Sequence, residues 1–308
     1  MNVLGFCCGR KNGNTEIMMK EAFMTIEEKT GATCNLVRIQ DAYIHKCEGC
    51  ESCMINHLKG NWDFRCIHKV GSDHFNYIEQ LMREADAIIV SSPVYNLMPT
   101  GPLINFLNKM HASGNYRDVV HKENKIAAAF TLGGTDWTNY ALSICKMTAM
   151  EFAGSYDAVV DAVHFDFLPS KDVVLLHDEV LERMRELGEN ISDALLAKQD
   201  GKTIEYRGKQ GICPDCHGDL LQVMDDGFYC PQCLIKADVT GNGSDIKIEF
   251  KPEEVEKSRW RPWGQELHNN NIRKGHMEAA KGMADIKERQ GKYTAYDRAV
   301  KLPELVKE

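Results

Sequence analysis

The chain has 308 residues, of which 43% are hydrophobic, and a formal net charge of -8 at pH 7. This length can bury the core of one large domain and a smaller one without disulfide support, and the negative charge argues against nucleic acid as a partner. No apolar run approaches the roughly 20 residues of a membrane helix. Because the sequence starts without a signal peptide, we expect a cytoplasmic protein whose 12 cysteines stay reduced and can serve metals.

An anion-binding loop is predicted directly after the first strand. The apolar run at residues 3–6 leads into a polar loop at residues 8–15, and a segment rich in Met, Glu and Ala follows as a helix. The backbone N–H groups of such a loop and the positive end of the helix dipole stabilise a phosphate. We expect Asn14 or Thr15 to cap the helix and to reach a phosphate oxygen. A plain capped turn is the alternative, and the loop lacks the ending of a Walker motif.

Four further strands are predicted at residues 33–39, 86–91, 125–132 and 156–163. Two of them, 86–91 and 125–132, are continuously apolar, which is typical of buried parallel strands. Helices are expected at residues 75–85, 101–110, 137–151 and 172–198. Strands that alternate with helices in this way predict an α/β fold with a parallel sheet covered on both faces.

Ligand binding is expected at the carboxyl ends of these strands. Loops at residues 8–15, 93–99 and 133–137 share this edge, and together they suit a mononucleotide with a planar head, such as flavin mononucleotide (FMN). Glycines in the third loop let the backbone approach a flat ring, whereas Tyr95 could either contact the ligand or serve packing alone. The predicted cofactor-binding residues are Cys8, Arg10, Asn12, Asn14, Thr15, Pro93, Val94, Tyr95, Asn96, Gly133 and Gly134.

A cysteine-rich insertion occupies residues 41–74. Cys47, Cys50 and Cys53 follow one another at every third position, and Cys66 comes after twelve intervening residues. A C-x2-C-x2-C run with a more distant fourth cysteine is typical of iron–sulfur ligation. A zinc knuckle or a set of free thiols is the alternative.

Taken together, the loop from Arg10 to Thr15, the Pro93-Val94-Tyr95 loop and the cysteine run after the second strand resemble the iron–sulfur flavoproteins of the NADPH-dependent FMN reductase superfamily. The resemblance covers residues 1–198. It implies a flavodoxin-like, doubly wound five-stranded parallel sheet in a domain of residues 1–200. It also implies bound FMN, a four-iron cluster held by Cys47, Cys50, Cys53 and Cys66, and a homodimer or homotetramer. The chain departs from the family at Cys8-Gly9, where the family has Ser-Pro. It departs also at Cys66, which lies beyond residues 54–65, whereas the fourth cysteine of the family follows the third by a handful of residues; the sequence leaves the role of Cys66 as fourth ligand open.

A second metal motif lies in residues 201–250. Cys213 and Cys216 form one C-P-x-C pair, Cys230 and Cys233 form another, and thirteen residues separate the pairs. Two such knuckles bring four thiolates to tetrahedral geometry, so the segment resembles a zinc ribbon with a structural ion. Iron, as in rubredoxin, is the alternative. We expect His217 at the surface, since four cysteines already fill the site.

The C-terminal tail, residues 251–308, is less informative. A strand is predicted at 244–250 just before it, and a helix at 278–290. The stretch at 258–263 combines cations with tryptophans, and it could bind a partner or anchor the tail to the body. Residues 218–227 of the ribbon carry three aspartates and no Lys or Arg, which argues against a nucleic-acid surface.

The predicted function is that of an FMN-dependent oxidoreductase or electron-transfer protein that couples flavin to an iron–sulfur cluster. Its electron donor would be NAD(P)H or ferredoxin, and its acceptor a redox partner protein or a small molecule. The cofactors supply this chemistry, and no constellation of side chains demands a catalytic acid, base or nucleophile. One alternative is an NAD(P)H-dependent flavin, quinone or small-molecule reductase without a cluster. Another is a redox-sensing scaffold that acts through the ribbon.

Overall fold

The computed structural model describes residues 1–60, 66–68, 72–113, 125–154, 157–296 and 298–300. Some residues of the predicted segments lie outside this set. They are residue 156 of the fifth predicted strand, residues 61–65 and 69–71 of the insertion, and residues 297 and 301–308 of the tail. Residues 1–261 form one compact unit and residues 262–308 another.

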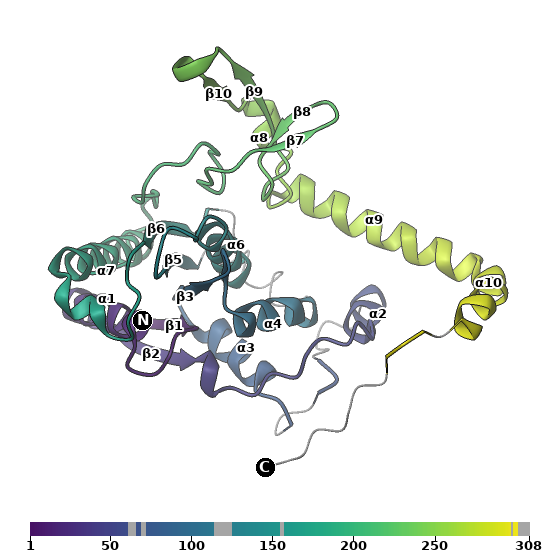
Figure 1. The fold of residues 1–308 in the computed structure, drawn as a ribbon, viewed down its shortest axis with the longest axis horizontal. Helices are drawn as coiled ribbons and strands as arrows, with labels where there is room; N and C mark the ends of the chain where they lie inside the picture. Colours follow the sequence, from purple (N-terminus) through teal and green to yellow (C-terminus); the bar gives the residue numbers. More distant parts are fainter. Residues whose placement is uncertain (61–65, 69–71, 114–124, 155–156, 297, 301–308) are drawn as a thin grey trace. The chain divides into compact units, whose positions relative to one another are not determined.

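A parallel sheet forms the centre of the first unit (Figure 1). Its strands are β1 (Asn2–Cys7), β2 (Thr33–Arg38), β3 (Ala87–Tyr95), β5 (Ile126–Leu132) and β6 (Val159–Phe165), in the order β2-β1-β3-β5-β6. The predicted five-stranded parallel sheet is therefore confirmed, and β4 (Met98–Pro99) adds a short antiparallel pair with β3. The strand order reverses between β1 and β3, which is the place where such sheets bind ligands.

Helices cover both faces of the sheet. On one face lie α1 (Asn14–Thr30) and α7 (Asp178–Gln199), and on the other α3 (Phe75–Glu84), α4 (Gly101–Lys109) and α6 (Ala141–Ala153) (Figure 1). The central strand shows why its sequence is continuously apolar. Ile88 and Val90 pack into the core under α4 and α6, whereas Ala87 and Ile89 pack into the core under α1 and α7. A strand buried on both faces needs apolar residues at every position.

Several helix bounds differ from those predicted. The helix expected at 137–151 begins only at Ala141, and the one expected at 172–198 begins at Asp178, after a 3-10 turn, η3 (Val173–Leu176). The late start of α7 has a tertiary cause, because the backbone amide of Val174 donates a hydrogen bond to Asn14 Oδ1 at 3.1 Å. Such a contact leaves no trace in the local periodicity of the sequence.

The described part of the insertion contains one helix, α2 (Ser52–Leu58), and the insertion begins at the end of the 3-10 turn η1 (Ile39–Asp41). A second 3-10 turn, η2 (Met110–Ser113), follows α4 directly. The insertion leaves the sheet at the end of β2, which is paired in register with the end of β1. The cysteine loop therefore departs from the same edge of the sheet as the anion-binding loop.

The ribbon is an antiparallel sheet of β7 (Gln222–Met224), β8 (Gly227–Tyr229), β9 (Lys236–Thr240) and β10 (Lys247–Glu249). The 3-10 turn η4 (Gly243–Asp245) connects β9 to β10, and the short helix α8 (Pro252–Val255) follows β10. In the second unit, α9 (Pro262–Lys281) and α10 (Met283–Ala295) meet at Gly282, where a single helix at 278–290 was predicted. No helix in the described part of the chain is both long and apolar enough to span a bilayer.

Candidate active site and metal centres

A cavity of about 240 Å³ opens at the carboxyl ends of the strands. Four loops line it, namely those after β1, β3, β5 and β6. Eight of the predicted residues are among its lining: Arg10, Asn14, Thr15, Pro93, Val94, Tyr95, Gly133 and Gly134. The cavity thus gathers residues from all three predicted loops at one place.

The fourth loop, residues 168–171, was missed by the sequence reasoning. Leu168, Pro169, Ser170 and Lys171 all line the cavity. A signal was present, because a Pro-Ser-Lys segment follows the last strand at the same edge of the sheet. Its contribution includes a second cation beside Arg10.

Three of the predicted cofactor residues do not line the cavity. Cys8 is 0% exposed and its side chain belongs to the hydrophobic core, where burial raises the pKa of the thiol well above the ordinary value. Asn12 and Asn96 both have positive φ, 53° and 51°, and act as turn residues. Asn96 and Leu97 form the tight turn between β3 and β4, a position that asparagine tolerates better than most residues.

Asn14 fastens the first loop to the fourth. Its Nδ2 donates to the carbonyls of Ser170 at 2.7 Å and Leu168 at 3.3 Å, while its backbone amide donates to Lys171 O at 2.6 Å. The predicted capping role is wrong, because Gly13 is the N-cap residue of α1 and makes no side-chain cap bond. With its amide group bonded in this way, Asn14 joins two walls of the cavity.

The start of α1 is suited to an anion. The dipole of the helix points its positive end into the cavity, and Arg10 and Lys171 add two cations. Glu16, in the first turn, does not oppose them because Arg38 binds it through bonds of 2.8 and 2.9 Å. These bonds, together with Lys20, lower the pKa of Glu16 from 4.5 to about 2. The carboxylate is thus neutralised by its own partners.

The loop after β5 brings backbone close to the cavity. A Cβ atom on Gly133 would lie 2.3 Å from Thr138 Cγ2, so only glycine fits there. A hydrogen-bonded chain holds the loop from below: Thr131 Oγ1 lies 2.7 Å from His164 Nδ1, and His164 Nε2 lies 2.9 Å from Asp166 Oδ1. Tyr95, which is 57% exposed, lies at the rim. The lining of the cavity thus includes glycine backbone and one aromatic ring.

The four cysteines of the insertion line a single pocket. Cys47, Cys50, Cys53 and Cys66 surround it together with His68 and Lys109. No three metal-ligating atoms of these residues lie within 4.8 Å of one another, since among the described residues only the ribbon cysteines do so. A single ion with four metal–sulfur bonds needs sulfurs about 3.8 Å apart. The pocket therefore has a thiol set spaced more widely than one tetrahedral ion requires.

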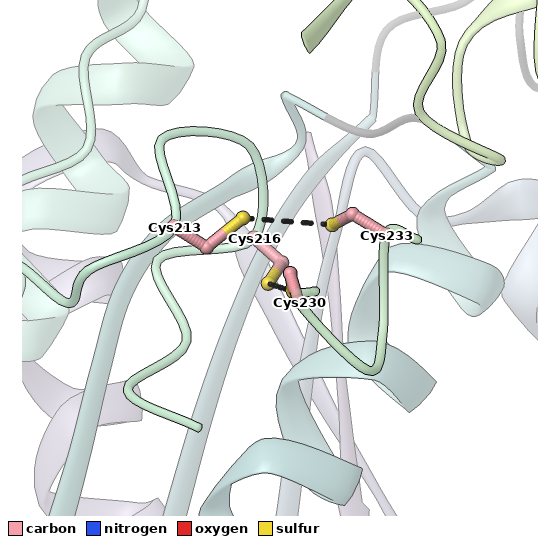
Figure 2. Close-up of side chains that lie close together, drawn as sticks. All are labelled: Cys213, Cys216, Cys230 and Cys233. Atoms are coloured by element: carbon pink, nitrogen blue, oxygen red, sulfur yellow. Dashed lines mark hydrogen bonds between the residues drawn. The ribbon is translucent and has the colours of Figure 1, made fainter. Parts of the chain in front are cut away.

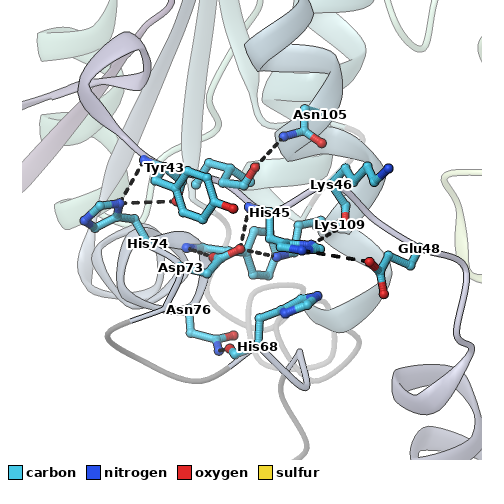
Figure 3. Close-up of polar contacts among 12 residues, drawn as sticks. Tyr43, His45, Lys46, Glu48, His68, Asp73, His74, Asn76, Asn105 and Lys109 are labelled. Atoms are coloured by element: carbon cyan, nitrogen blue, oxygen red, sulfur yellow. Dashed lines mark hydrogen bonds and ion pairs between the residues drawn. The ribbon is translucent and has the colours of Figure 1, made fainter. Parts of the chain in front are cut away.

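A partly buried polar network holds the segment before this pocket against α4 and the start of α3 (Figure 3). Asp73 accepts hydrogen bonds from the backbone amides of His45 at 2.7 Å and Phe75 at 2.5 Å, and it pairs with Lys109. Asn105 on α4 adds a bond to Ile44 O at 2.9 Å, so the segment just before Cys47 is held by α4 and by Asp73, which precedes α3. The rings of His45 and His68 stack with centroids 3.9 Å apart.

Comparison with known proteins decides the family. Residues 1–157 match the NADPH-dependent FMN reductase family. The chain belongs to this family. Membership makes the protein a flavin-dependent oxidoreductase and agrees with the flavodoxin-like strand order.

Two curated proteins and one solved structure are similar to this member of the FMN reductase family. The chain is 27% identical over 274 residues to flavone synthase cfoJ of Aspergillus candidus, covering 81% of each chain. It is 26% identical over 191 residues to an iron–sulfur flavoprotein of Archaeoglobus fulgidus, covering 61% of this chain and 77% of that protein. A solved flavone reductase superposes with a TM-score of 0.76 at 22% identity, over 99% of this chain and all of the other, which shows that the fold is shared.

The ribbon cysteines of this FMN reductase family member form a compact tetrathiol site (Figure 2). Cys213 Sγ lies 3.8 Å from Cys233 Sγ, and Cys216 Sγ lies 3.6 Å from Cys230 Sγ. These separations match the edge of about 3.8 Å expected for a tetrahedral tetrathiolate. Hydrogen bonds with the neighbouring Cys213 and Cys230 sulfurs, together with burial, raise the pKa of the Cys216 thiol. The site fits one metal ion with a closed coordination sphere.

The ribbon packs on α6 of the flavin domain. Lys146 Nζ donates to His217 O at 2.6 Å, and Gln232 Nε2 donates to Ser143 O. His217 is not at the surface as predicted, because its ring stacks on Tyr206 with centroids 3.7 Å apart. Burial lowers the pKa of His217 to about 4. It is a packing residue and not a metal ligand.

The stretch before α9 anchors to the ribbon. Trp260 Nε1 donates to Gln232 O at 3.0 Å, and the backbone amide of Arg259 donates to Cys233 O at 3.0 Å. Arg261 binds Asp215 through bonds of 3.1 and 3.0 Å. The sequence left open whether this cationic and aromatic stretch binds a partner or anchors the tail. The structure shows that residues 259–261 anchor it to the ribbon.

Proposed function

We propose that this protein is an FMN-dependent oxidoreductase in which electrons pass between a flavin in the loop cavity and an iron–sulfur cluster held by Cys47, Cys50, Cys53 and Cys66. One observation carries the proposal: all four cysteines line one pocket, and their sulfurs are spaced more widely than a single ion requires. The curated relative named as an iron–sulfur flavoprotein supports it.

The residues of the loop cavity fit FMN. The start of α1, Arg10 and Lys171 would hold the phosphate, since they concentrate positive charge and backbone N–H groups. Gly133 and Gly134 would let the ring approach the backbone, and Tyr95 would cover it. Bound FMN would supply both hydride and single-electron chemistry. The protein itself would orient the flavin ring and would balance the negative charge of the FMN phosphate with Arg10 and Lys171.

The residues of the cysteine pocket fit a cluster. Four thiols are the donors that iron–sulfur clusters use, and a four-iron cluster takes all four. Lys109 lines the same pocket from α4 and is paired with the Asp73 carboxylate, so this ion pair would hold one wall of the cluster site in place. NAD(P)H or ferredoxin would serve as donor, and a redox partner protein or a small molecule as acceptor. A homodimer or homotetramer would be the functional assembly.

The deciding experiment is metal, sulfide and flavin analysis of protein purified without oxygen, together with a visible spectrum. We expect about four iron and four sulfide per chain, and a broad absorption beneath the flavin bands. A Cys50→Ser variant should lose the iron yet keep flavin and the ribbon metal. Cys34→Ser, which removes a half-buried thiol outside both metal sites, is the matched control and should keep everything. Iron at the wild-type level in Cys50→Ser would refute the ligand assignment.

A second candidate is an NAD(P)H-dependent reductase of planar small molecules that works without a cluster. The similarity to flavone synthase cfoJ, which covers 81% of each chain, favours it, and so does the fold shared with a flavone reductase along almost the whole chain. Protein that contains flavin and zinc but no iron, and that still oxidises NAD(P)H when a flavone is added, would establish this candidate over the first.

A further inference from the structure

Three lysines are buried in the described part of the chain: Lys109, Lys125 and Lys146, at 2%, 4% and 3% exposure. A buried ammonium is costly unless opposite charge or several acceptors compensate for lost water. Lys109 has such a partner in the Asp73 carboxylate. Lys125 donates to two carbonyls, Arg83 O and Ala85 O, at the end of α3, where the helix dipole is negative.

Lys146 differs from the other two. Its one hydrogen bond in the described structure is the 2.6 Å contact with His217 O, and it takes part in none of the ion pairs there. Asp219 is the nearby carboxylate whose charge acts on it, but that residue is exposed and beyond ion-pair distance. The carboxylates of the protein therefore do not balance the positive charge of Lys146.

The tetrathiol site lies on the other side of this contact. His217 directly follows Cys216, so the ammonium rests against the knuckle that carries two of the ribbon sulfurs. All four ribbon cysteines belong to the same apolar cluster as Cys145 and Ala149 of α6. A divalent ion with four thiolates carries net negative charge, and in apolar surroundings that charge acts strongly on a neighbouring cation.

We propose that Lys146 is the counter-charge of the ribbon metal centre, so that metal binding and the packing of the ribbon on α6 stabilise each other. The ammonium lacks a carboxylate partner. Two other cations lie near the metal site, but Arg261 is paired with the Asp215 carboxylate and Arg259 is exposed, so Lys146 is the fully buried cation in the described residues that bonds to a knuckle. The metal is thereby part of the flavin domain's support, since α6 follows the glycine loop of the flavin cavity. This inference does not depend on the reaction that the flavin carries out.

The first test measures zinc release. Full-length protein loaded with zinc is mixed with excess chromogenic chelator, and the rate is compared among variants. We expect Lys146→Met to release zinc about 10- to 100-fold faster, as is typical when an outer-shell partner of a metal site is lost. Lys146→Arg keeps the charge and should remain near wild type. Lys247→Met removes the same charge from an exposed position of the ribbon sheet and should change nothing.

A second test avoids mutation of α6 and decides the matter if Lys146→Met fails to fold. Hydrogen exchange of the wild-type protein is followed with zinc bound and after its removal by chelation. Peptides from α6 should exchange at least about tenfold faster without zinc, whereas peptides from α7 should not change. Unchanged zinc release in a folded Lys146→Met, or unchanged exchange in α6 after zinc removal, would overturn the proposal.

Discussion

The Lys109 ammonium lies 2.5 Å from the Asp73 carboxylate, and both side chains are only 1% exposed. The pair joins the end of α4 to the residues that precede α3, and the same carboxylate accepts the amide of His45 at 2.7 Å. His45 lies two residues before Cys47. The buried pair therefore fixes the entry of the cysteine loop as well as one wall of its pocket.

Breaking this pair should unfold the insertion. Lys109→Met leaves the Asp73 carboxylate buried without its cation, and we expect a loss of about 3–5 kcal/mol in the free energy of unfolding. The double variant with Asp73→Asn removes both charges and should recover much of that loss. Urea denaturation measures the stability, and iron analysis reports on the pocket. If Lys109→Met were as stable as wild type, the ion pair with Asp73 would not stabilise the fold.

The two glycines of the loop after β5 should respond differently to alanine. A Cβ atom on Gly133 would meet Thr138 Cγ2 at 2.3 Å and Thr135 O at 3.0 Å, whereas on Gly134 its nearest neighbour would be Pro169 Cα at 3.4 Å. We expect Gly133→Ala to cost about 1–3 kcal/mol through overpacking, and Gly134→Ala to cost little. Urea denaturation of the flavin-free proteins separates this packing effect from ligand contacts. Equal losses in the two variants would contradict the geometry.

Asn14 should be needed for the shape of the flavin cavity. Asn14→Ala leaves the Ser170 carbonyl and the Val174 amide without their bonds, so we expect a loss of about 2 kcal/mol and roughly tenfold weaker FMN binding. Asn14→Asp keeps the acceptor for the Val174 amide, so its stability and FMN affinity should lie between those of wild type and Asn14→Ala. Quenching of FMN fluorescence gives the affinity. Lys11→Ala changes an exposed residue of the same loop and serves as control; an effect as large in Lys11→Ala would mean that the loop is merely sensitive to change.

Glu16 should make stability depend on acid pH. Its pKa falls from 4.5 to about 2 in the folded protein, so its contribution is complete above about pH 4.5 and is lost as the pH falls toward 2. Replacing it by Gln should cost about 1–2 kcal/mol at pH 7, less than the full shift implies because Lys20 is half-exposed and screened. The difference between wild type and Glu16→Gln in urea denaturation should shrink by pH 3. Glu28→Gln, on the exposed side of α1, should show no such trend.

Local patterns predicted much of the fold. The alternation of apolar runs with helical segments led to the parallel sheet, because strand and helix periods are written in neighbouring residues. The helix starts were less accurate: α7 begins at Asp178 since η3 is held by Asn14, more than 150 residues away in the chain. The predicted N-cap of α1 was also wrong. The Asn14 side chain bonds to the loop at 168–171, and Gly13 is the N-cap residue of α1.

The two sets of cysteines and the family resemblance could be recognised in the sequence, because the spacing of cysteines and of loop residues is a local property of the chain. Only the tertiary structure decided which groups stand around those sites. It removed Cys8 from the cavity by burying it, added Lys171 to the wall, and set Lys109 beside the cysteine pocket and Lys146 beside the ribbon. These relationships join residues far apart in the chain, and their energies come from burial and packing, which no spacing along the sequence records.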